Sequence, residues 1–183
     1  MTDLTETIRT RLGIDQAVDW DTVYSSELPR VYNFFLYKIG DREFAQDLTA
    51  TTFERAWKQH SRYHSILASP TTWLFGIARN VLKEHFRASQ KAIQRSARPS
   101  QRNELASQMD TDRMIQQQQD HEYLRKMLLE LPERAQDLIA LKYGAGLNNR
   151  QIAKISGLSE SNVGSILHRT VKNLRKRWDE NHG

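Results

Sequence analysis

The chain has 183 residues, which suits one or two small domains, and its lack of cysteine excludes disulfides, thiolate catalysis and cysteine-ligated zinc. Lysine and arginine number 27 against 22 acidic residues, so a polyanionic partner is favoured. The N-terminus is too polar for a signal peptide, and no apolar run is long enough to cross a bilayer. We therefore expect a cytoplasmic protein with no membrane insertion.

Helical periodicity dominates the chain and predicts an all-α fold of two small domains. Apolar residues recur at spacings of three and four over residues 20–90 and again over 121–183. Residues 91–120 are rich in Gln, Ser and Arg and poor in large apolar residues, so they predict a flexible linker. Residues 1–19 form a separate N-terminal arm. The sequence has no internal repeat and no glycine-rich phosphate loop.

The stretch "DREFAQDLTATTFERAWKQ", residues 41–59, predicts a helix with two unlike faces. Its wide apolar arc comprises Phe44, Leu48, Phe53, Ala56 and Trp57. Its narrow polar ridge comprises Asp47, Thr51, Glu54 and Lys58. Such a ridge suits a helical partner, with charges setting the register, but a plain solvated surface has the same pattern. On the residues alone, the solvated surface is the simpler interpretation.

The stretch that begins "TTWLFGIARN" at residue 71 predicts a helix with a basic stripe. The apolar arc that we expect to be buried comprises Trp73, Leu74, Ile77, Ala78, Val81, Leu82 and Phe86. The opposite face carries Arg79, Lys83 and Arg87 at intervals of four, with Gly76 and Asn80 among them. This face suits a polyanion, although an ordinary solvated surface helix is the alternative.

The C-terminal third predicts a helix-turn-helix. Asn148 and Gln151 suit a helix N-terminus, Gly157 suits a sharp turn, and Ser159 can cap the next helix. We expect that second helix to bury Val163, Ile166, Leu167, Val171 and Leu174. Its outward face comprises Ser161, Ser165, His168, Arg169, Lys172 and Lys176. Short polar residues followed by cations suit base edges and then phosphates, while a hairpin for protein contact is the alternative.

Three motifs together resemble one known family. "DLTATTFERAW", "TTWLFGIARNVLKEHFR" and "LPERAQDLIALKYGAGLNNRQIAKISGLSESNVGSILHRTVKNLRK" occur in the order and spacing of the extracytoplasmic-function (ECF, group IV) sigma factors of the sigma-70 superfamily. The resemblance covers about residues 20–90, as sigma region 2, and 120–178, as sigma region 4. It implies a protein, not an enzyme, that binds core RNA polymerase and directs promoter-specific initiation by recognising and melting DNA.

The resemblance also implies roles for particular residues. Contacts to the minus-ten element are expected from Arg62, Tyr63, His64, Ser65, Gly76, Arg79, Asn80, Lys83 and Arg87. Contacts to core polymerase are expected from Asp47, Leu48, Thr51, Glu54 and Lys58. Contacts to the minus-thirty-five element are expected from Ser159, Glu160, Ser161, Asn162, Ser165, His168, Arg169 and Lys172. Trp73 is expected to be mainly a core anchor, whereas Tyr63 either stacks on an extruded base or belongs to the core.

The expected partners are promoter DNA, the clamp coiled coil and flap of core polymerase, and an anti-sigma factor that the residues do not identify. Gly164 stands where many relatives carry lysine, and Ser156 where a larger apolar residue often packs, so no known promoter sequence is transferred. We expect no cofactor and no metal, because His60 and His64 have no third ligand nearby. The alternative function is a conventional helix-turn-helix regulator with an N-terminal sensory or dimerising domain.

Overall fold

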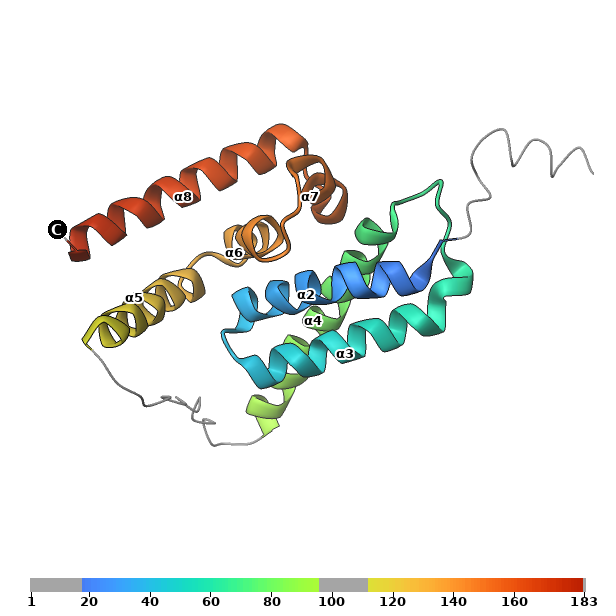
Figure 1. Ribbon diagram of the computed structural model, residues 1–183, viewed down its shortest axis with the longest axis horizontal. Coiled ribbons are helices and arrows are strands. Elements are labelled where there is room, and N and C mark those ends of the chain that lie inside the picture. The colour runs from blue at the N-terminus through green and yellow to red at the C-terminus, as the bar shows by residue number, and fades with distance from the viewer. Residues whose placement is uncertain (1–17, 96–111, 183) are drawn as a thin grey trace, which may run out of the picture.

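The computed structural model describes residues 18–95 and 112–182, without the side chains of 91–95 and 112–118. Every regular element in this part of the chain is helical, which confirms the all-α prediction (Figure 1). None of the described helices combines the length and apolarity that crossing a bilayer requires.

The first region contains α2 (Trp20–Ile39), α3 (Arg42–Gln59), the 3₁₀ turn η1 (His60–Arg62) and α4 (Pro70–Arg95). The Asp19 carboxylate caps α2 by accepting the backbone N–H groups of Asp21 and Thr22. Gly40 ends α2 with φ of 72°, and the Asp41 carboxylate at once caps α3. The two helices are therefore joined by a turn of minimal length and pack side by side.

The core of this region is aromatic. Phe34, Phe35 and Phe75 are fully buried, and the Phe34 and Phe75 rings meet edge to face with centroids 5.8 Å apart. The predicted buried arc of α4 is confirmed for Leu74, Ile77, Ala78, Val81 and Leu82. The prediction was wrong for Phe86, which is 40% exposed.

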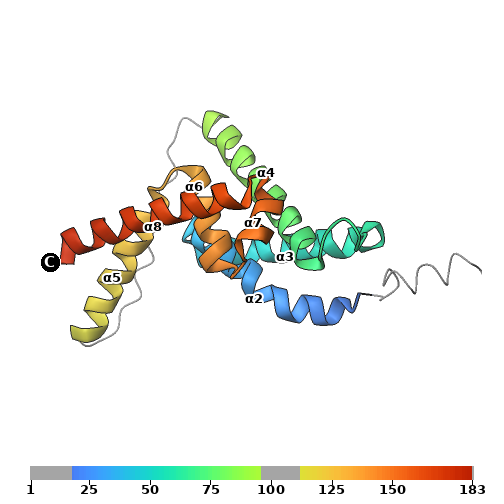
Figure 2. The ribbon, with the colours of Figure 1, turned by 90° about the horizontal axis from the view of Figure 1, so that it is seen from above.

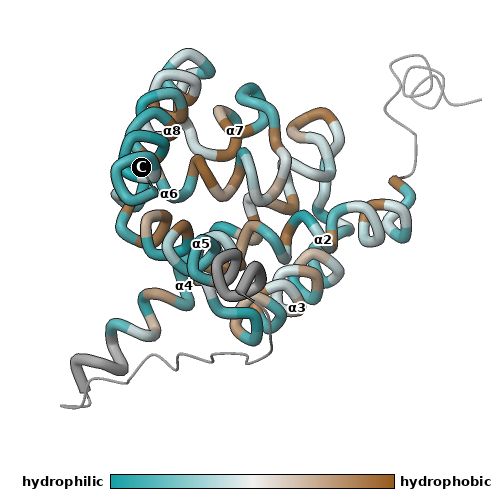
Figure 3. Tube along the Cα trace, turned by 60° about the vertical axis from the view of Figure 1, so that its left-hand side comes forward, coloured by the Kyte–Doolittle hydropathy of each residue, from teal (hydrophilic) through white to brown (hydrophobic). Residues whose placement is uncertain are grey.

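The second region contains α5 (Asp112–Leu129), α6 (Glu133–Ile139), the π-helical turn η2 (Ala140–Gly144), α7 (Asn149–Ser156) and α8 (Glu160–His182). The predicted capping box of α7 is confirmed: Asn148 accepts from the Gln151 N–H, and the Gln151 side chain accepts from the Asn148 N–H. Gly157 has φ of 74°, as the predicted turn requires. The C-terminal part of α8 is almost wholly hydrophilic in Figure 3.

Helices enter the predicted linker from both sides. α4 continues to Arg95, and α5 begins at Asp112, whereas the linker was predicted over residues 91–120. Gln, Arg, Lys and Ala have good helix propensity, so a stretch too polar to close a core can still extend a helix. The middle of the predicted linker, 96–111, lies outside the described residues.

The two regions pack directly on each other, with η2 and α6 against α2 and with α7 against α4 (Figures 1 and 2). The buried Lys38 ammonium lies 2.5 Å from the Asp137 carboxylate and 3.0 Å from the Gln136 side-chain oxygen. Arg30 donates to the Ala145 carbonyl at 2.8 Å. A Cβ at Gly144 would lie 3.0 Å from the Asn33 carbonyl, so glycine permits this close approach.

Candidate nucleic-acid interface

The N-terminal half of α8 presents the clearest candidate surface for DNA. The Ser159 hydroxyl accepts the Asn162 N–H at 3.2 Å, which confirms the predicted cap and fixes the start of the helix. Val163 and Leu167 are buried against the domain core. The predicted outward residues are all exposed: Ser159, Glu160, Ser161, Asn162, Ser165, His168, Arg169 and Lys172. Short polar side chains thus precede the longer cationic ones along one accessible face.

Sequence reasoning missed a cationic hollow beside this face. A pocket of about 420 Å³ is lined by His168, Lys172 and Arg175 of α8 and by Lys142 of η2, with Tyr143 at its side. Lys142 lies in η2, whereas the other three basic residues lie on α8. A periodicity within one helix therefore could not have identified Lys142 as their neighbour. Four basic side chains around one hollow strengthen the case for a phosphate-contacting surface.

The two departures from the family pattern fall in the helix-turn-helix hairpin. A Cβ at Gly164 would meet the Asn149 side-chain nitrogen at 3.5 Å, an ordinary contact, so the absence of a side chain there is not forced by the fold. The Ser156 hydroxyl and the Asn149 side-chain oxygen are buried without a hydrogen-bond partner among the described residues. An unpaired buried polar atom is unfavourable, so these two groups lower the stability of the hairpin.

The basic stripe of α4 divides into exposed and engaged members. Asn80, Lys83 and Arg87 are exposed, as expected for a surface that meets a polyanion. The expectation of a free outward Arg79 was wrong for this arrangement, because its side chain is only 20% exposed. It donates to the Ile155 carbonyl at 2.6 Å and lies 3.3 Å from the Asp137 carboxylate. A partner 58 residues away in the chain cannot be read from helical spacing.

Tyr63, in the loop before α4, lies among other aromatic rings. Its hydroxyl donates to the Ala68 carbonyl at 2.8 Å, and its ring packs edge-on against Trp20 and Trp73 with centroids 5.3 and 5.4 Å away. Burial raises the pKa of the Tyr63 phenol. Tyr63 is therefore part of an aromatic cluster, and this cluster also places Trp73 as the expected anchor.

The exposed part of this loop contains residues that sequence reasoning passed over. Arg62, His64 and Ser65 are exposed, as expected of base-contacting candidates. Ile66 and Leu67 are 73% and 79% exposed, which is unusual for large apolar residues. The signal was an apolar pair within a polar loop that no amphipathic helix could bury.

Of the five residues on α3 that were expected to contact core polymerase, four are accessible and Leu48 is not. Asp47, Glu54 and Lys58 are exposed and Thr51 is half-buried, while Lys58 pairs with Glu54 and lowers the pKa of that carboxyl through a hydrogen bond. Leu48 is buried in the core, so its side chain cannot meet a partner here. The polar residues nevertheless form one continuous line along α3.

Nothing in the described residues gathers three or more His, Asp or Glu side chains in a metal-binding arrangement. His60 and His64 lie on either side of Tyr63, and the His60 Nδ1 is hydrogen-bonded to the Trp57 carbonyl. Their spacing of four was the only metal-like signal in the sequence, and it falls in η1 and the following loop, where the i, i+4 rule for helices does not apply.

Comparison with known proteins agrees with this division into two regions. Residues 23–92 match the family model for sigma-70 region 2, and residues 121–174 match that for sigma-70 region 4. The ECF RNA polymerase sigma factor SigM of Bacillus subtilis is 28% identical, over 87% of this chain and 94% of that one. The ECF RNA polymerase sigma factor SigX of the same organism is 27% identical, over 86% of this chain and 82% of that one.

Two solved structures share the fold. The sigma factor RpoE of Bartonella quintana, solved with the anti-sigma factor NepR, superposes with a TM-score of 0.67 at 21% identity, over 86% of this chain and 95% of that one. CnrH, solved with the cytosolic domain of CnrY, gives a TM-score of 0.56 at 17% identity, over 93% and 90%. With both sigma regions matched in order, the chain belongs to the ECF sigma factors, non-enzymatic transcription initiation factors that bind core RNA polymerase and direct it to promoters.

Proposed function

We propose that each of three surfaces of this sigma factor has its own target. The N-terminal turns of α8 read the minus-thirty-five element, the loop before α4 and the exposed stripe of α4 hold the minus-ten element, and the α3 ridge docks on the clamp coiled coil. The flap of the polymerase receives region 4. The protein would work in the cytoplasm, where polymerase and promoters meet.

The observation that carries this proposal is the order of side chains on α8. Ser161, Asn162 and Ser165 come first and are exposed, and Arg169 and Lys172 follow on the same accessible side. A recognition helix brings its N-terminal residues to base edges in the major groove, while cations further along meet phosphates. A hairpin for protein contact would gain nothing from this order.

In region 2, we assign capture of an extruded base to the exposed tip of the loop. Arg62, His64 and Ser65 supply hydrogen-bonding groups, and the apolar side chains of Ile66 and Leu67 supply a surface against which a base can pack. Tyr63 is a positioning residue, because its hydroxyl bond to Ala68 and its ring contacts hold the base of the loop. Lys83 and Arg87 contact the phosphate backbone further from the loop. Gly76 lets the strand approach α4, because nothing lies within 4 Å of its missing Cβ.

On α3, we assign the clamp contact to Asp47, Thr51, Glu54 and Lys58. These residues are spaced at three and four, so they form a line that a partner helix can follow. Charges along such a line set orientation and register more than affinity. Leu48 contributes indirectly, because its buried side chain packs α3 against the core.

The packing of the two regions explains why core polymerase is needed. Arg79 cannot reach a phosphate while it is bonded to α7 and to Asp137, so region 4 must move away before the whole α4 stripe is available. Binding to polymerase would supply the free energy for that separation. The free chain would then have little affinity for promoters.

Run-off transcription with purified core polymerase tests the function as a whole. Initiation from a cognate promoter should appear only when this protein is added, and robust initiation by core alone would refute the assignment. Binding of the isolated protein to duplex DNA separates it from a conventional regulator, which would bind tightly unaided and would not associate with core.

Selection of upstream elements tests the orientation of α8. Substituting Asn162 or Ser165 should relax preference at one base position and cost about 1–3 kcal/mol there. Arg169→Ala or Lys172→Ala is the matched control, which should weaken all sequences together because phosphate contacts carry no sequence information. A uniform loss from the Asn162 and Ser165 variants would show that the helix lies differently in the groove.

An anti-sigma factor is the further partner that we propose. The two structures superposed above were each solved as complexes, and RpoE was solved with an anti-sigma factor. Copurification from cells, followed by competition with core polymerase, tests this partner. Absence of a stoichiometric inhibitor in every growth condition would favour control through expression instead.

A further inference from the structure

Glu27 of α2 carries a buried carboxylate that has no role in the surfaces assigned above. It is 5% exposed, and no other acidic residue is buried in the part of the chain that the structure describes. A buried charge is costly unless it is paired and hydrogen-bonded. Arg30 donates to both Glu27 oxygens at 2.8 and 2.9 Å, and the Thr71 hydroxyl donates to one of them at 2.7 Å. Glu27 therefore connects α2 to the first turn of α4.

Arg30 extends this connection to region 4. Its side chain is half-buried, and its Nε donates to the Ala145 carbonyl at 2.8 Å, although the two residues are 115 positions apart. Ala145 directly follows η2 and lies just before Asn148, the N-cap of α7. The α2 helix packs against both α4 and η2, so the path from one to the other crosses a single helix (Figure 1). Arg30 thus binds a carboxylate of region 2 and the start of the helix-turn-helix at the same time.

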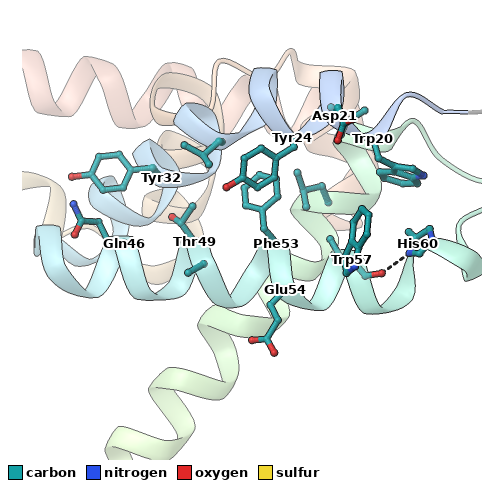
Figure 4. Close-up of a pocket in the computed structure, with 15 residues that line it drawn as sticks. Trp20, Asp21, Tyr24, Tyr32, Gln46, Thr49, Phe53, Glu54, Trp57 and His60 are labelled. Atoms are coloured by element: carbon teal, nitrogen blue, oxygen red, sulfur yellow. Dashed lines mark hydrogen bonds between the residues drawn. The ribbon is translucent and has the colours of Figure 1, made fainter.

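The loop before α4, residues 63–69, is attached to α2 at both of its ends. At its start, the Tyr63 ring packs on Trp20, at the N-terminal end of α2 (Figure 4), with centroids 5.3 Å apart. Directly after its end, the Thr71 hydroxyl binds Glu27. The first attachment consists of rings within region 2. The second continues through the guanidinium to region 4, so it can respond to the position of that region.

Separation of the two regions would weaken the second attachment. Arg30 would lose the Ala145 carbonyl, and water would reach both the guanidinium and the carboxylate of Glu27. A hydrogen bond to a hydrated carboxylate competes with water, so it contributes less than the same bond in a buried site. The Thr71 hydroxyl would then be held less firmly, and the adjoining end of the loop would gain freedom.

We propose that Glu27 is a positioning residue through which region 4 restrains the loop before α4. While the regions are docked, hydrogen bonds from Arg30 and Thr71 to Glu27 keep the loop fixed. When core polymerase separates the regions, the loop is released and can close around a base. This inference rests on the proposed role of the loop in base capture. Because coupling is reciprocal, a base that draws Thr71 away from Glu27 also weakens the docking of region 4.

Hydrogen exchange in the full-length protein measures this restraint. The reporters are the amides of Leu67 and Trp73, whose backbone hydrogen bonds are each 3.0 Å long. Asp137→Ala and Gly144→Val open the molecule by attacking separate contacts, and small-angle scattering verifies the opening. Opening should raise both exchange rates about fivefold, the factor expected when one hydrogen bond loses its net contribution. Unchanged rates in an open variant would overturn the proposal, and so would a molecule that neither substitution opens.

Substitutions of Thr71 separate this restraint from a general loss of stability. Thr71→Val removes the hydroxyl but keeps the branched shape, so the reporter amides should exchange rapidly even in the docked molecule, and opening should add nothing. Thr71→Ser keeps the hydroxyl and should respond to opening as the wild type does. Thr72→Val is the matched control, because it breaks a hydroxyl contact of 2.9 Å with Ser69 instead. Its exchange should start higher but still rise on opening, and an equal response of Thr71→Val would show that the path does not run through Glu27.

The exchange experiment contains no DNA, so its outcome is separate from that of base capture. Base capture is tested in holoenzyme with a single-stranded minus-ten fragment, for which Arg62→Ala and His64→Ala should each lower the affinity. Unchanged affinity in both holoenzymes refutes the proposed role of the loop, and with it the release for base capture. Unchanged exchange on opening refutes the restraint by region 4 even where the loop binds DNA.

Discussion

The outward faces of α4 and α8 are similar in sequence but differ in what they contact. Both carry cations and short polar residues at helical spacing, and both were predicted to meet DNA. On α8 the whole face is exposed, whereas on α4 the first cation, Arg79, is bonded to the other region. Periodicity therefore identifies a polar face, but tertiary packing decides whether that face is free for a nucleic acid.

Asp137→Ala should have the largest effect on the difference in accessibility between the cations of α4 and those of α8. Asp137 is the shared partner of Lys38 and Arg79, and removing one partner of a buried pair costs about 3–5 kcal/mol. Separation of the two regions would hydrate Lys38, so we expect the molecule to open rather than to unfold. Small-angle X-ray scattering should report a larger radius of gyration, with the Arg79 side chain released.

Lys38→Met is the control for that experiment. It removes the buried ammonium at similar volume and leaves Asp137 paired with Arg79, so the two regions should stay together. If Asp137→Ala leaves both the scattering curve and the urea midpoint unchanged, the ion pairs do not hold the regions together, and the difference between α4 and α8 has another cause.

Gly144→Ala should give the next largest effect. Its Cβ would lie 3.0 Å from the Asn33 carbonyl and 3.1 Å from the Tyr37 ring, and overpacking of this kind costs about 1–3 kcal/mol. The destabilisation should appear as weaker association between the regions, measured by scattering and by hydrogen exchange in α2 and η2. A variant with unchanged exchange would show that the contact adapts without strain.

Gly76→Ala is the matched change on α4. Nothing lies within 4 Å of its missing Cβ, and alanine is the better helix former by about 1 kcal/mol, so the free protein should be as stable or more stable. Open-complex formation should nevertheless fall if the DNA strand approaches the helix closely at this point. Full activity of this variant would remove Gly76 from the proposed site.

Lys83→Ala and Arg87→Ala test whether the exposed cations of the α4 stripe contact phosphates. Each should weaken open-complex formation on all promoters alike and reduce the salt slope by about one unit, because one phosphate is no longer neutralised. Arg79→Ala should differ, because it also loosens the closed arrangement of the free chain. A changed minus-ten preference with an unchanged slope would make Lys83 or Arg87 a base-reading residue.

Most of the fold was predictable because its signals are local. The cap at Asn148, the positive φ of Gly157 and the burial of Val163 and Leu167 each depend on residues within a few positions of one another. The other members of the predicted buried arc of α8 are only half-buried: Ile166, Val171 and Leu174. The outward face of α8 was predictable for the same reason. Its proposed target rests on the family resemblance.

Two features that spacing could not reveal depend on residues that are distant in sequence. Arg79 meets Asp137, and Tyr63 packs against Trp20 and Trp73. Leu48 lies next to Asp47 in the ridge motif, yet one position along a helix turns a side chain by about 100° and places Leu48 in the core. Spacing gives the direction of a side chain but not the element that it faces.

The smallest expected effect concerns the far end of α8, where Trp178 and His182 stack and both pack against Tyr123 of α5. The Trp178 carbonyl and then Asp120, through hydrogen bonds to the ring, raise the pKa of His182 above its ordinary value of 6.5. A raised folded-state pKa means that the contact is fully stabilised below the unfolded-state pKa and weakens as pH rises through the folded-state value. α8 is thus anchored more firmly to α5 in mild acid, although His182 is exposed and the effect is small.

An NMR titration of the His182 ring, assigned with His182→Gln, measures this anchor directly. The midpoint should lie above 6.5 in the intact protein, and Asp120→Asn should lower it only partway, because the Trp178 carbonyl remains as the larger cause. Hydrogen exchange at the C-terminal end of α8 should rise over the same pH interval, while exchange at its N-terminal turns should not. A midpoint at or below the ordinary value would show that ring stacking alone holds the end of α8, and that protonation of His182 does not strengthen this contact.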